Sequence, residues 1–401
     1  MNKKYKRVGK HKSSISIPLP LTNMKFFTVS LILRMFKFIG VHPKGHRNPI
    51  QLFLFLMNSF VYLSTIYLCI LVFVFEKNLD LLKITDTLES LILLFHGLLT
   101  LVAAYMKHAE ILDLIRDMRN FWEPDDVQDE NERNANFAIL KTVKIIFIYF
   151  LCFAVIPSSF FYFRPFILRK RVLAFNSYIP ESIPYPILYL LETYAFVVID
   201  FSCMAWDGFC ATVIIVAYVQ WRILNREIRR MLELKIESEE DKEILRKKVK
   251  RCVDHHHFLY RYSSKINDMM SNILLIFLAL TVSANCIEIF KISNKPPVKE
   301  ILLCVTYVGS LTNEFVIFYC IPGQLLTSEA ERTDFYSYCS NWYESGIIYK
   351  KSIMRMICMM SRQKVVITAG KIVNIGMETG LQTYKVVVSY YMFLRTIQSS
   401  Q

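Results

Sequence analysis

Three stretches of this chain contain no charged residue over about the length of a bilayer-spanning helix. They are residues 50–75, 145–163 and 269–287. Roughly 20 apolar residues in a helix cross about 30 Å of hydrocarbon, so each stretch can span a membrane unaided. The backbone of a lipid-embedded segment must satisfy its own hydrogen bonds, which a helix does within one segment. The sequence therefore predicts an all-α, polytopic membrane protein.

Four further segments are apolar but carry interruptions. They include acidic and basic residues that a lone lipid-facing helix would avoid, and their limits are residues 84–106, 187–221, 301–327 and 375–397. With these segments we predict seven transmembrane helices. Asp200 and Asp207 in the fourth are seven positions apart and so share one helical face. A carboxylate at mid-bilayer costs about 2.5 kcal/mol or more, so both should face protein or water.

The net charge of +14 is placed as in a membrane protein rather than a nucleic-acid-binding one. Lys and Arg are concentrated in alternate loops, and positive loops stay on the cytoplasmic side. Six basic residues fall within the first 12 positions, and no acidic residue precedes Glu76. The basic second outer loop, residues 164–171, goes against the trend locally. The overall bias predicts an internal N-terminus and, after seven spans, an external C-terminus.

The polar segments between the spans complete the predicted organisation. Residues 24–39 are amphipathic and are expected to lie along the inner membrane surface. Residues 221–264 alternate in charge and carry apolar positions at helical spacing, which predicts that the fourth and fifth helices continue into the cytoplasm and join near Ser238. A solvated intracellular loop is the alternative for this segment. The predicted regions are 1–48 (basic arm and amphipathic helix), 49–220 (first to fourth spans, with a ligand-binding outer half), 221–264 (helical extensions), 265–327 (fifth and sixth spans), 328–374 (cytoplasmic helical anchor region) and 375–401 (pore-lining seventh span and short outer tail).

Motifs for catalysis and for cofactor binding are absent from the sequence. It contains no P-loop, G-x-G-x-x-G, G-x-S-x-G or H-E-x-x-H pattern. His255, His256 and His257 are adjacent on a helix, so their side chains diverge by about 100° and cannot share one ion. We interpret them as a surface cluster, and the cysteines as packed thiols. No catalytic residue, metal site or cofactor is expected, and the chain is not expected to be an enzyme.

The last third of the chain carries two recognisable motifs. Residues 368–372 (TAGKI) with 377–379 (MET) are similar to a "TAGK…LET" segment, and the closing helix is similar to "K-x-S-x-S-Y-x-x-L-L-R". Both are motifs of the insect odorant receptor family, which this chain therefore resembles. Val387 and Gly380 depart from the pattern, where the family has Ser and Phe. The residues that match the second motif are Lys385, Ser389, Tyr390, Leu394 and Arg395.

The resemblance implies a subunit of an odorant-gated, non-selective cation channel in the plasma membrane of olfactory neurons. Such a channel is a tetramer that includes a shared co-receptor, and a small apolar volatile opens it. Thr383-Tyr384 also resembles the "TY…QF" ending of gustatory receptors, although no Gln-Phe follows. A gustatory receptor is therefore the main alternative. A G-protein-coupled receptor would need the opposite orientation and its own Arg-Tyr and Asn-Pro motifs, which are not in place.

The resemblance also places two sets of functional residues. An apolar, aromatic pocket in the outer half of the bundle would bind a volatile mainly by dispersion and burial. Its candidate lining residues are Phe95, His96, Phe153, Ile156, Phe160, Phe201, Met204, Ala205, Tyr307 and Leu311. In the closing helix, one face aligns with the family's apolar constriction and is the expected gate. Its residues are Ser389, Phe393, Thr396 and Ile397.

Overall fold

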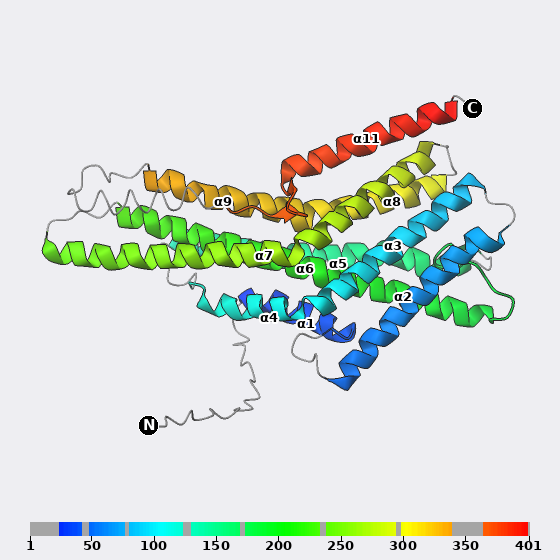
Figure 1. The fold of residues 1–401 in the computed structure, drawn as a ribbon, viewed down its shortest axis with the longest axis horizontal. Helices are drawn as coiled ribbons and strands as arrows, with labels where there is room; N and C mark the ends of the chain where they lie inside the picture. The colour runs from blue at the N-terminus through cyan, green and yellow to red at the C-terminus, as the bar shows by residue number, and fades with distance from the viewer. Residues whose placement is uncertain are drawn as a thin grey trace, which may run out of the picture.

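Almost every element of the chain is a helix, as the apolar stretches predict. The computed structural model describes residues 24–41, 48–76, 80–122, 130–168, 173–232, 238–293, 298–338 and 364–399. Figure 1 shows α6 and α7 running along the long axis of the molecule. The elements are α1 (Met24–Phe38), α2 (Pro49–Phe75), α3 (Leu81–Met106), α4 (His108–Asp117), η2 (Met118–Asn120), α5 (Glu130–Leu168), α6 (Tyr185–Leu232), α7 (Glu239–Ser293), α8 (Val298–Phe315), η4 (Val316–Cys320), α9 (Ile321–Tyr338), β1 (Thr368–Ala369), β2 (Val373–Asn374) and α11 (Met377–Ser399).

Two helix starts have clear local causes. The Asn48 side chain accepts a hydrogen bond from the backbone N–H of Ile50 at 3.0 Å, and Pro49 occupies the first turn of α2. At the start of α7, Ser238 Oγ accepts from the backbone N–H of Asp241 at 3.1 Å. The Asp241 carboxylate accepts in return from the backbone N–H of Ser238 at 2.9 Å. This reciprocal cap begins α7 near the junction that the sequence predicts.

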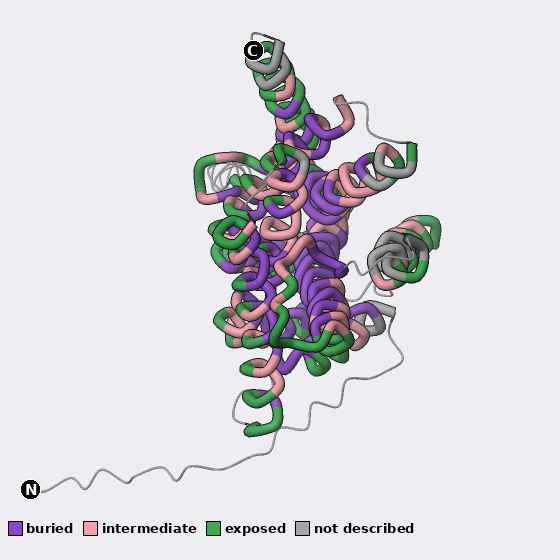
Figure 2. Tube along the Cα trace, turned by 90° about the vertical axis from the view of Figure 1, so that its right-hand side faces the viewer, coloured by how far each residue is buried: buried purple, intermediate pink, exposed green. Residues whose placement is uncertain are grey.

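The central helix of the bundle is α6. It packs against α1, α2, α3, α5, α7 and α9. Every residue from 202 to 217 is buried, which covers all sides of α6 over more than four turns, and Trp206 and Phe209 in this stretch are almost fully buried. A helix that is apolar around its whole circumference belongs in the middle of a bundle. Figure 2 shows the buried residues gathered in the centre of the molecule.

The two long helices continue well beyond their apolar parts, as predicted. α6 has 48 residues and α7 has 55. At about 1.5 Å per residue, both are more than twice as long as a hydrocarbon core is thick. Past the apolar part of α6, Asn225 donates to the backbone oxygen of Glu329 at 2.8 Å and accepts from Thr333 at 2.6 Å. These bonds attach α9 to the extension.

Five segments of the described chain are long and apolar enough to cross a membrane. They are Pro49–Phe75, Lys83–Met106, Tyr185–Met231, Glu239–Ser293 and Cys304–Tyr336. These correspond to the first, second, fourth, fifth and sixth predicted spans. The third and seventh predicted spans fall on α5 and α11. The total of seven and the orientation stay predictions.

The sixth predicted span contains a π-helical segment that the sequence pattern does not reveal. α8 and α9 are joined through η4, a five-residue π turn, so the helical path is continuous. π turns inside helices occur often at functional sites. Here the turn places Tyr319 against α6, where its hydroxyl donates to the Asp207 carboxylate.

The amphipathic segment near the N-terminus forms α1, which packs against α6 and α5. Its apolar face is fully buried at Ile32 and Phe36. The Phe36 ring meets Phe209 edge-on, with centroids 6.2 Å apart. Amphipathicity here therefore reflects packing on the bundle. The predicted position at the membrane surface stays a prediction.

A short hairpin precedes α11, and it explains the TAGK motif physically. β1 pairs antiparallel with β2, and the turn holds Gly370 and Lys371 at positive φ. A Cβ on Gly370 would lie 2.6 Å from Leu275 Cδ2 of α7. The backbone N–H of Gly370 donates to Ser271 O at 2.8 Å, and that of Thr368 to Asn267 Oδ1 at 2.7 Å. The motif therefore fixes the hairpin to α7 and sets where α11 begins.

The last helix, α11, projects from the rest of the bundle, as Figure 1 shows at the red end of the chain. It packs against α7 and η4. Val387 is its most deeply buried large apolar residue. Much of its remaining apolar surface is exposed, at Leu381, Tyr384, Val386, Val388, Tyr390, Met392 and Phe393.

Candidate functional site

A small cavity lies in the middle of the bundle between α3, α6, α7 and η4. It has no room for a water-sized sphere, so its walls are nearly in contact. The lining is mainly apolar, with a few polar groups directed inward, as in sites for small organic molecules. Its lining residues are His96, Leu99, Thr100, Trp206, Asp207, Met270, Ile273, Leu274, Phe277 and Tyr319.

The polar groups in and around this cavity come from three different helices and η4. Asp207 is fully buried and accepts a hydrogen bond from the Tyr319 hydroxyl. The His96 ring stacks on Phe277 with centroids 4.6 Å apart. Cys203 Sγ lies 3.7 Å from His96 Nδ1, and Glu314 Oε1 lies 3.8 Å from His96 Nε2. The interior is thus apolar overall but holds a compact group of ionisable side chains.

Asp200 and Asp207 both meet protein partners, as their shared helical face predicts. Asp207 has the hydroxyl of Tyr319, and Asp200 accepts from the Tyr162 hydroxyl at 3.1 Å. Glu192, about two helical turns before Asp200 on α6, accepts a hydrogen bond from the backbone N–H of Phe175 at 3.0 Å. The acidic residues of α6 therefore serve local hydrogen bonding within the bundle.

The predicted ligand-lining residues fall into several groups. His96 lines the cavity, while Met204, Ala205 and Leu311 are buried nearby in the bundle and Tyr307 is half-buried. Phe95 is 47% exposed, which places it on the outward side of α3. The Phe201 ring packs against Phe38 of α1, with centroids 4.5 Å apart and the ring planes tilted by 39°. The side chains of the remaining three lie outside the described residues: Phe153, Ile156 and Phe160.

Sequence reasoning missed most of the cavity lining. Phe277 and Met270 belong to α7, and the predicted pocket drew on no residue of that helix. Trp206 directly follows the predicted Met204 and Ala205 on α6. For Asp207 the sequence provides one signal: an acid within a predicted span is expected to face protein or water.

The predicted gate residues lie on α11. Ser389, Phe393 and Thr396 are exposed, and the side chain of Ile397 lies outside the described residues. Ser389 Oγ and Thr396 Oγ1 donate back to the carbonyls one turn earlier, at 2.8 and 2.9 Å. This satisfies both hydroxyls within the helix and leaves its outward surface largely apolar.

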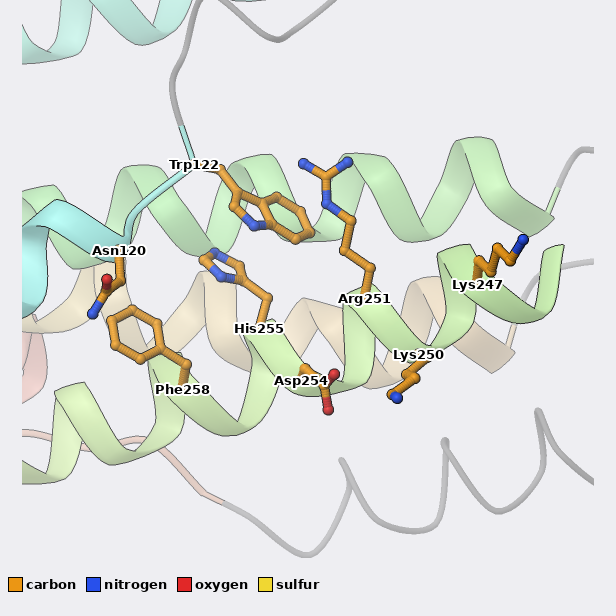
Figure 3. Close-up of a pocket in the computed structure, with 8 residues that line it drawn as sticks. All are labelled: Asn120, Trp122, Lys247, Lys250, Arg251, Asp254, His255 and Phe258. Atoms are coloured by element: carbon orange, nitrogen blue, oxygen red, sulfur yellow. The ribbon is translucent and has the colours of Figure 1, made fainter. Parts of the chain in front are cut away.

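The histidine cluster is not the surface feature that its sequence indicates. His255 and His256 are buried, and His255 stacks on Trp122 with centroids 3.9 Å apart (Figure 3). Trp122 is held by Gln220, whose amide exchanges two 2.9 Å hydrogen bonds with the Trp122 backbone. The side chains diverge, as predicted, but partners from α6 and from the segment after η2 enclose two of the three.

The same region carries a shallow basic pocket of about 450 Å³ on the charged part of α7. Lys247, Lys250 and Arg251 are among its lining residues. Figure 3 shows Arg251 directed toward Trp122 and Lys250 pointing the other way, and the Arg251 guanidinium lies 4.7 Å from the Trp122 ring centre. This part of α7 precedes the apolar stretch 269–287 by several turns. Burial, aided by the nearby positive charge of Arg251, lowers the pKa of His255 to about 3. The ring is therefore neutral under physiological conditions.

The fold and its interior define a class: a helical membrane protein with a closed, mainly apolar cavity between its helices. A family model described as 7tm Odorant receptor matches residues 80–388, well over half of the chain. The chain belongs to this family, which is a family of receptors and not of enzymes. The family match confirms the resemblance seen in the C-terminal motifs and favours it over the gustatory alternative.

Solved structures agree with the family at the level of the fold. The insect olfactory receptor OR5 from Machilis hrabei matches with a TM-score of 0.75 at 11% identity, covering 93% of this chain and 99% of that one. The same receptor in complex with eugenol matches with a TM-score of 0.75 at 11% identity, covering 94% and 100%. A search of curated protein sequences found no match to this chain.

Proposed function

We propose that this chain is the odorant-binding subunit of a ligand-gated, non-selective cation channel that assembles with a shared co-receptor. We place it in the plasma membrane of olfactory sensory neurons. The observation that carries this proposal is the state of α11. The helix projects from the bundle with a run of exposed apolar residues, and its sequence still includes Lys385 and Arg395.

The composition of α11 suits a pore lined by several subunits better than a lipid-facing span. Charged side chains in lipid are costly, whereas a pore-lining helix meets water on one face and neighbouring subunits on the others. In this arrangement the apolar surface of α11 packs against equivalent helices of partner subunits. Ser389, Phe393, Thr396 and Ile397 then line the axis, and an apolar ring at Phe393 and Ile397 closes the pore by dewetting.

The agonist in this proposal is a small, mainly apolar volatile that enters the interior of the bundle from the outer half. The solved neighbour is described as binding eugenol, a small aromatic molecule. In this chain the described cavity has no space for a water-sized sphere. An agonist must therefore displace side chains, and we propose that this displacement is transmitted to η4 and α11, which are in contact.

The decisive experiment is current recording from cells that express the chain with and without the co-receptor, during application of an odorant panel. We expect odorant-evoked cation current only with both subunits, and no effect of blocking G proteins. Robust current from this chain alone would remove the need for a partner. A response that disappears with G-protein blockade would remove the channel proposal itself.

The proposed orientation has a separate test in intact cells. Epitope tags at the two termini should differ in antibody access: the C-terminal tag is stained without permeabilisation, and the N-terminal tag only after it. Staining of the N-terminal tag on intact cells would reverse the topology.

A further inference from the structure

Three metal-binding side chains from three helices meet in the interior of the bundle. His96 belongs to α3, Cys203 to α6 and Glu314 to α8, and their exposed fractions are 3%, 6% and 7%. One donor atom from each lies within 4.8 Å of the other two. The sequence analysis looked for metal ligands at short spacing, and this group is invisible to that search because His96 and Cys203 are 107 positions apart.

The geometry leaves donor atoms facing one another without a hydrogen bond between them. His96 Nε2 and Glu314 Oε1 are 3.8 Å apart, which is too long for a hydrogen bond. Among the described residues, neither atom has a hydrogen-bond partner. Buried polar atoms are normally satisfied, and exceptions indicate an ion or another function at the position. Two such atoms directed at each other across a short gap are arranged as ligands are arranged around an ion.

The spacing fits a tetrahedral ion with modest closure. Bond lengths of about 2.0 to 2.3 Å at tetrahedral angles put neighbouring N, O and S donors about 3.3 to 3.6 Å apart. An ion binds only one nitrogen of His96, so only one of the two distances given above applies: 3.7 Å from Cys203 Sγ to Nδ1, or 3.8 Å from Glu314 Oε1 to Nε2. The set of three donor atoms, one from each residue, lies within 4.8 Å, and the side chains close on the ion when it binds. The histidine supplies one of its two nitrogens, which the ring orientation selects.

The donor types indicate which ion fits. Thiolate and imidazole favour zinc-like transition metals over calcium or magnesium, and three protein ligands leave a fourth position for water or another small donor. A thiolate and a carboxylate also offset the two positive charges of a divalent ion. This balance is important in a protein interior, where an uncompensated charge is costly. The neighbouring Asp207 has its own donor in Tyr319.

The surroundings hold the three side chains in place. Phe277 stacks on His96 and fixes its plane. α3 and α6 approach closely beside the group, where a Cβ on Gly97 would lie 2.7 Å from Ile199 Cγ1. Thr100 Oγ1 donates to Gly97 O at 2.9 Å and also contacts Cys203 Sγ at 3.7 Å. Support of this kind around the ligands is typical of sites that bind metal selectively.

We propose that His96, Cys203 and Glu314 form a buried zinc-binding site that ties α3, α6 and α8 together in the middle of the bundle. Binding of Zn²⁺ releases the proton of the Cys203 thiol and any proton on Glu314. The ion stabilises one packing of the three helices. The site is a property of the chain itself and does not depend on whether the assembled protein conducts ions.

The test uses the full-length chain, purified in nanodiscs and stripped of metal with a chelator. Zinc uptake is measured by mass spectrometry of the metal and by competition with a zinc-sensitive dye. Co²⁺ serves as a second probe, because a cobalt–thiolate bond has a near-ultraviolet charge-transfer band. The variants are Cys203→Ser, which changes one atom, and Glu314→Gln. Cys210→Ser is the matched control, because Cys210 is also buried on α6 two turns further along but lies outside the cluster.

We expect the wild-type chain and the Cys210→Ser variant to bind about one Zn²⁺ per chain. Cys203→Ser and Glu314→Gln should weaken binding by more than the roughly tenfold loss typical of mutating an outer-shell partner. The cobalt–thiolate band should vanish only in Cys203→Ser. Equal zinc affinity in the wild type and Cys203→Ser, or no uptake by a wild-type chain that remains monodisperse, would overturn the site. Channel activity plays no part in this readout, so its absence would count only against the proposed function.

Discussion

α6 and α11 look alike in sequence but differ in how the fold uses them. Each is an apolar helix interrupted by charged residues, at Glu192, Asp200 and Asp207 in α6 and at Lys385 and Arg395 in α11. The acids of α6 all accept hydrogen bonds from other parts of the chain, and the helix is surrounded on all sides. α11 is attached at one end and exposes most of its apolar surface.

This difference separates a helix whose packing partners all lie within the single chain from one whose apolar surface lacks partners within it. The partners of α6 lie within this chain, so substitutions there should change folding. The exposed apolar surface of α11 requires lipid or other subunits, so substitutions there should change assembly and gating and leave the stability of the single chain nearly unchanged. The first three predictions below pair a position in or against α6 with a matched position on α11, and the last compares two positions on α11.

The largest effect is expected from removing a large core side chain of α6. Trp206→Ala deletes a fully buried indole beside the central cavity, and it should lower the free energy of unfolding by about 3–5 kcal/mol. Tyr390→Ala on α11, where the ring is half exposed, should stay within about 0.5 kcal/mol. Thermal unfolding in nanodiscs, followed by circular dichroism, measures both. Similar losses for the two variants would contradict the division between the helices.

The glycines of the two helices give a second contrast. A Cβ on Gly208 of α6 would overlap the ring of Phe147 on α5. A Cβ on Gly380 of α11 would make only ordinary van der Waals contacts, 3.5 Å from Cys320 Sγ and 3.9 Å from Val316 Cγ2. Gly208→Ala should therefore destabilise the chain by about 1–3 kcal/mol through overpacking. Gly380→Ala should stabilise it by up to about 1 kcal/mol, because alanine is the better helix former. The same unfolding measurement compares them, and a tolerated Gly208→Ala would show that α5 and α6 are less closely packed.

A loss of similar size is expected from removing the hydrogen bond between η4 and α6. Tyr319→Phe removes the hydroxyl that donates to Asp207 and leaves a buried carboxylate oxygen without that donor. The cost should be about 1–3 kcal/mol, nearer the lower end if Asp207 takes up a proton. Tyr384→Phe on the exposed side of α11 is the control and should change nothing measurable. Equal unfolding midpoints for the two variants would mean that the hydrogen bond from Tyr319 to Asp207 contributes nothing measurable to stability.

Much of the fold follows from sequence because it depends on periodicity along the chain. Apolar stretches, with or without a few charged residues, locate five long apolar helices, and the apolar positions of residues 221–264 predict the continuation of α6 and α7. The hairpin at β1 and β2 escapes this kind of reasoning. Each strand has only two residues, and the hairpin depends on hydrogen bonds that its backbone N–H groups donate to Asn267 and Ser271 of α7, not on its own sequence pattern.

The site is harder to predict because it depends on how helices rotate against one another. A shift of one residue along a helix turns a side chain by about 100°, so a span can be located correctly while its inward face is not. Phe95 and His96 are adjacent, yet one is exposed and the other lines the cavity. His255 was assigned to the surface for a related reason. Trp122, which covers it, precedes it by more than 130 positions.

The sharpest test of the contrast is a substitution that should change current without changing stability. Phe393 is 58% exposed on α11 and lies on the predicted gate face with Ser389 and Thr396. Phe393→Ser should alter the free energy of unfolding by no more than about 0.5 kcal/mol, since the ring has few contacts within the chain. In the assembled channel it should wet an apolar constriction, because dewetting depends on apolar walls. The expected result is a raised basal cation current in cells that also express the co-receptor.

Met392→Ser is the matched control, because Met392 is equally exposed but points about 100° away from the gate face. It should leave the basal current at the wild-type level. Single cysteines at Phe393 and Ile397 extend the test: a water-soluble thiol reagent applied from outside should alter the current only while odorant holds the channel open. Leak from both serine variants would indicate a general weakening of α11 packing. If the reagent leaves the current of both cysteine variants unchanged, with normal surface expression, the pore lies on another helix. The proposal that α11 serves gating while α6 serves folding would then be wrong.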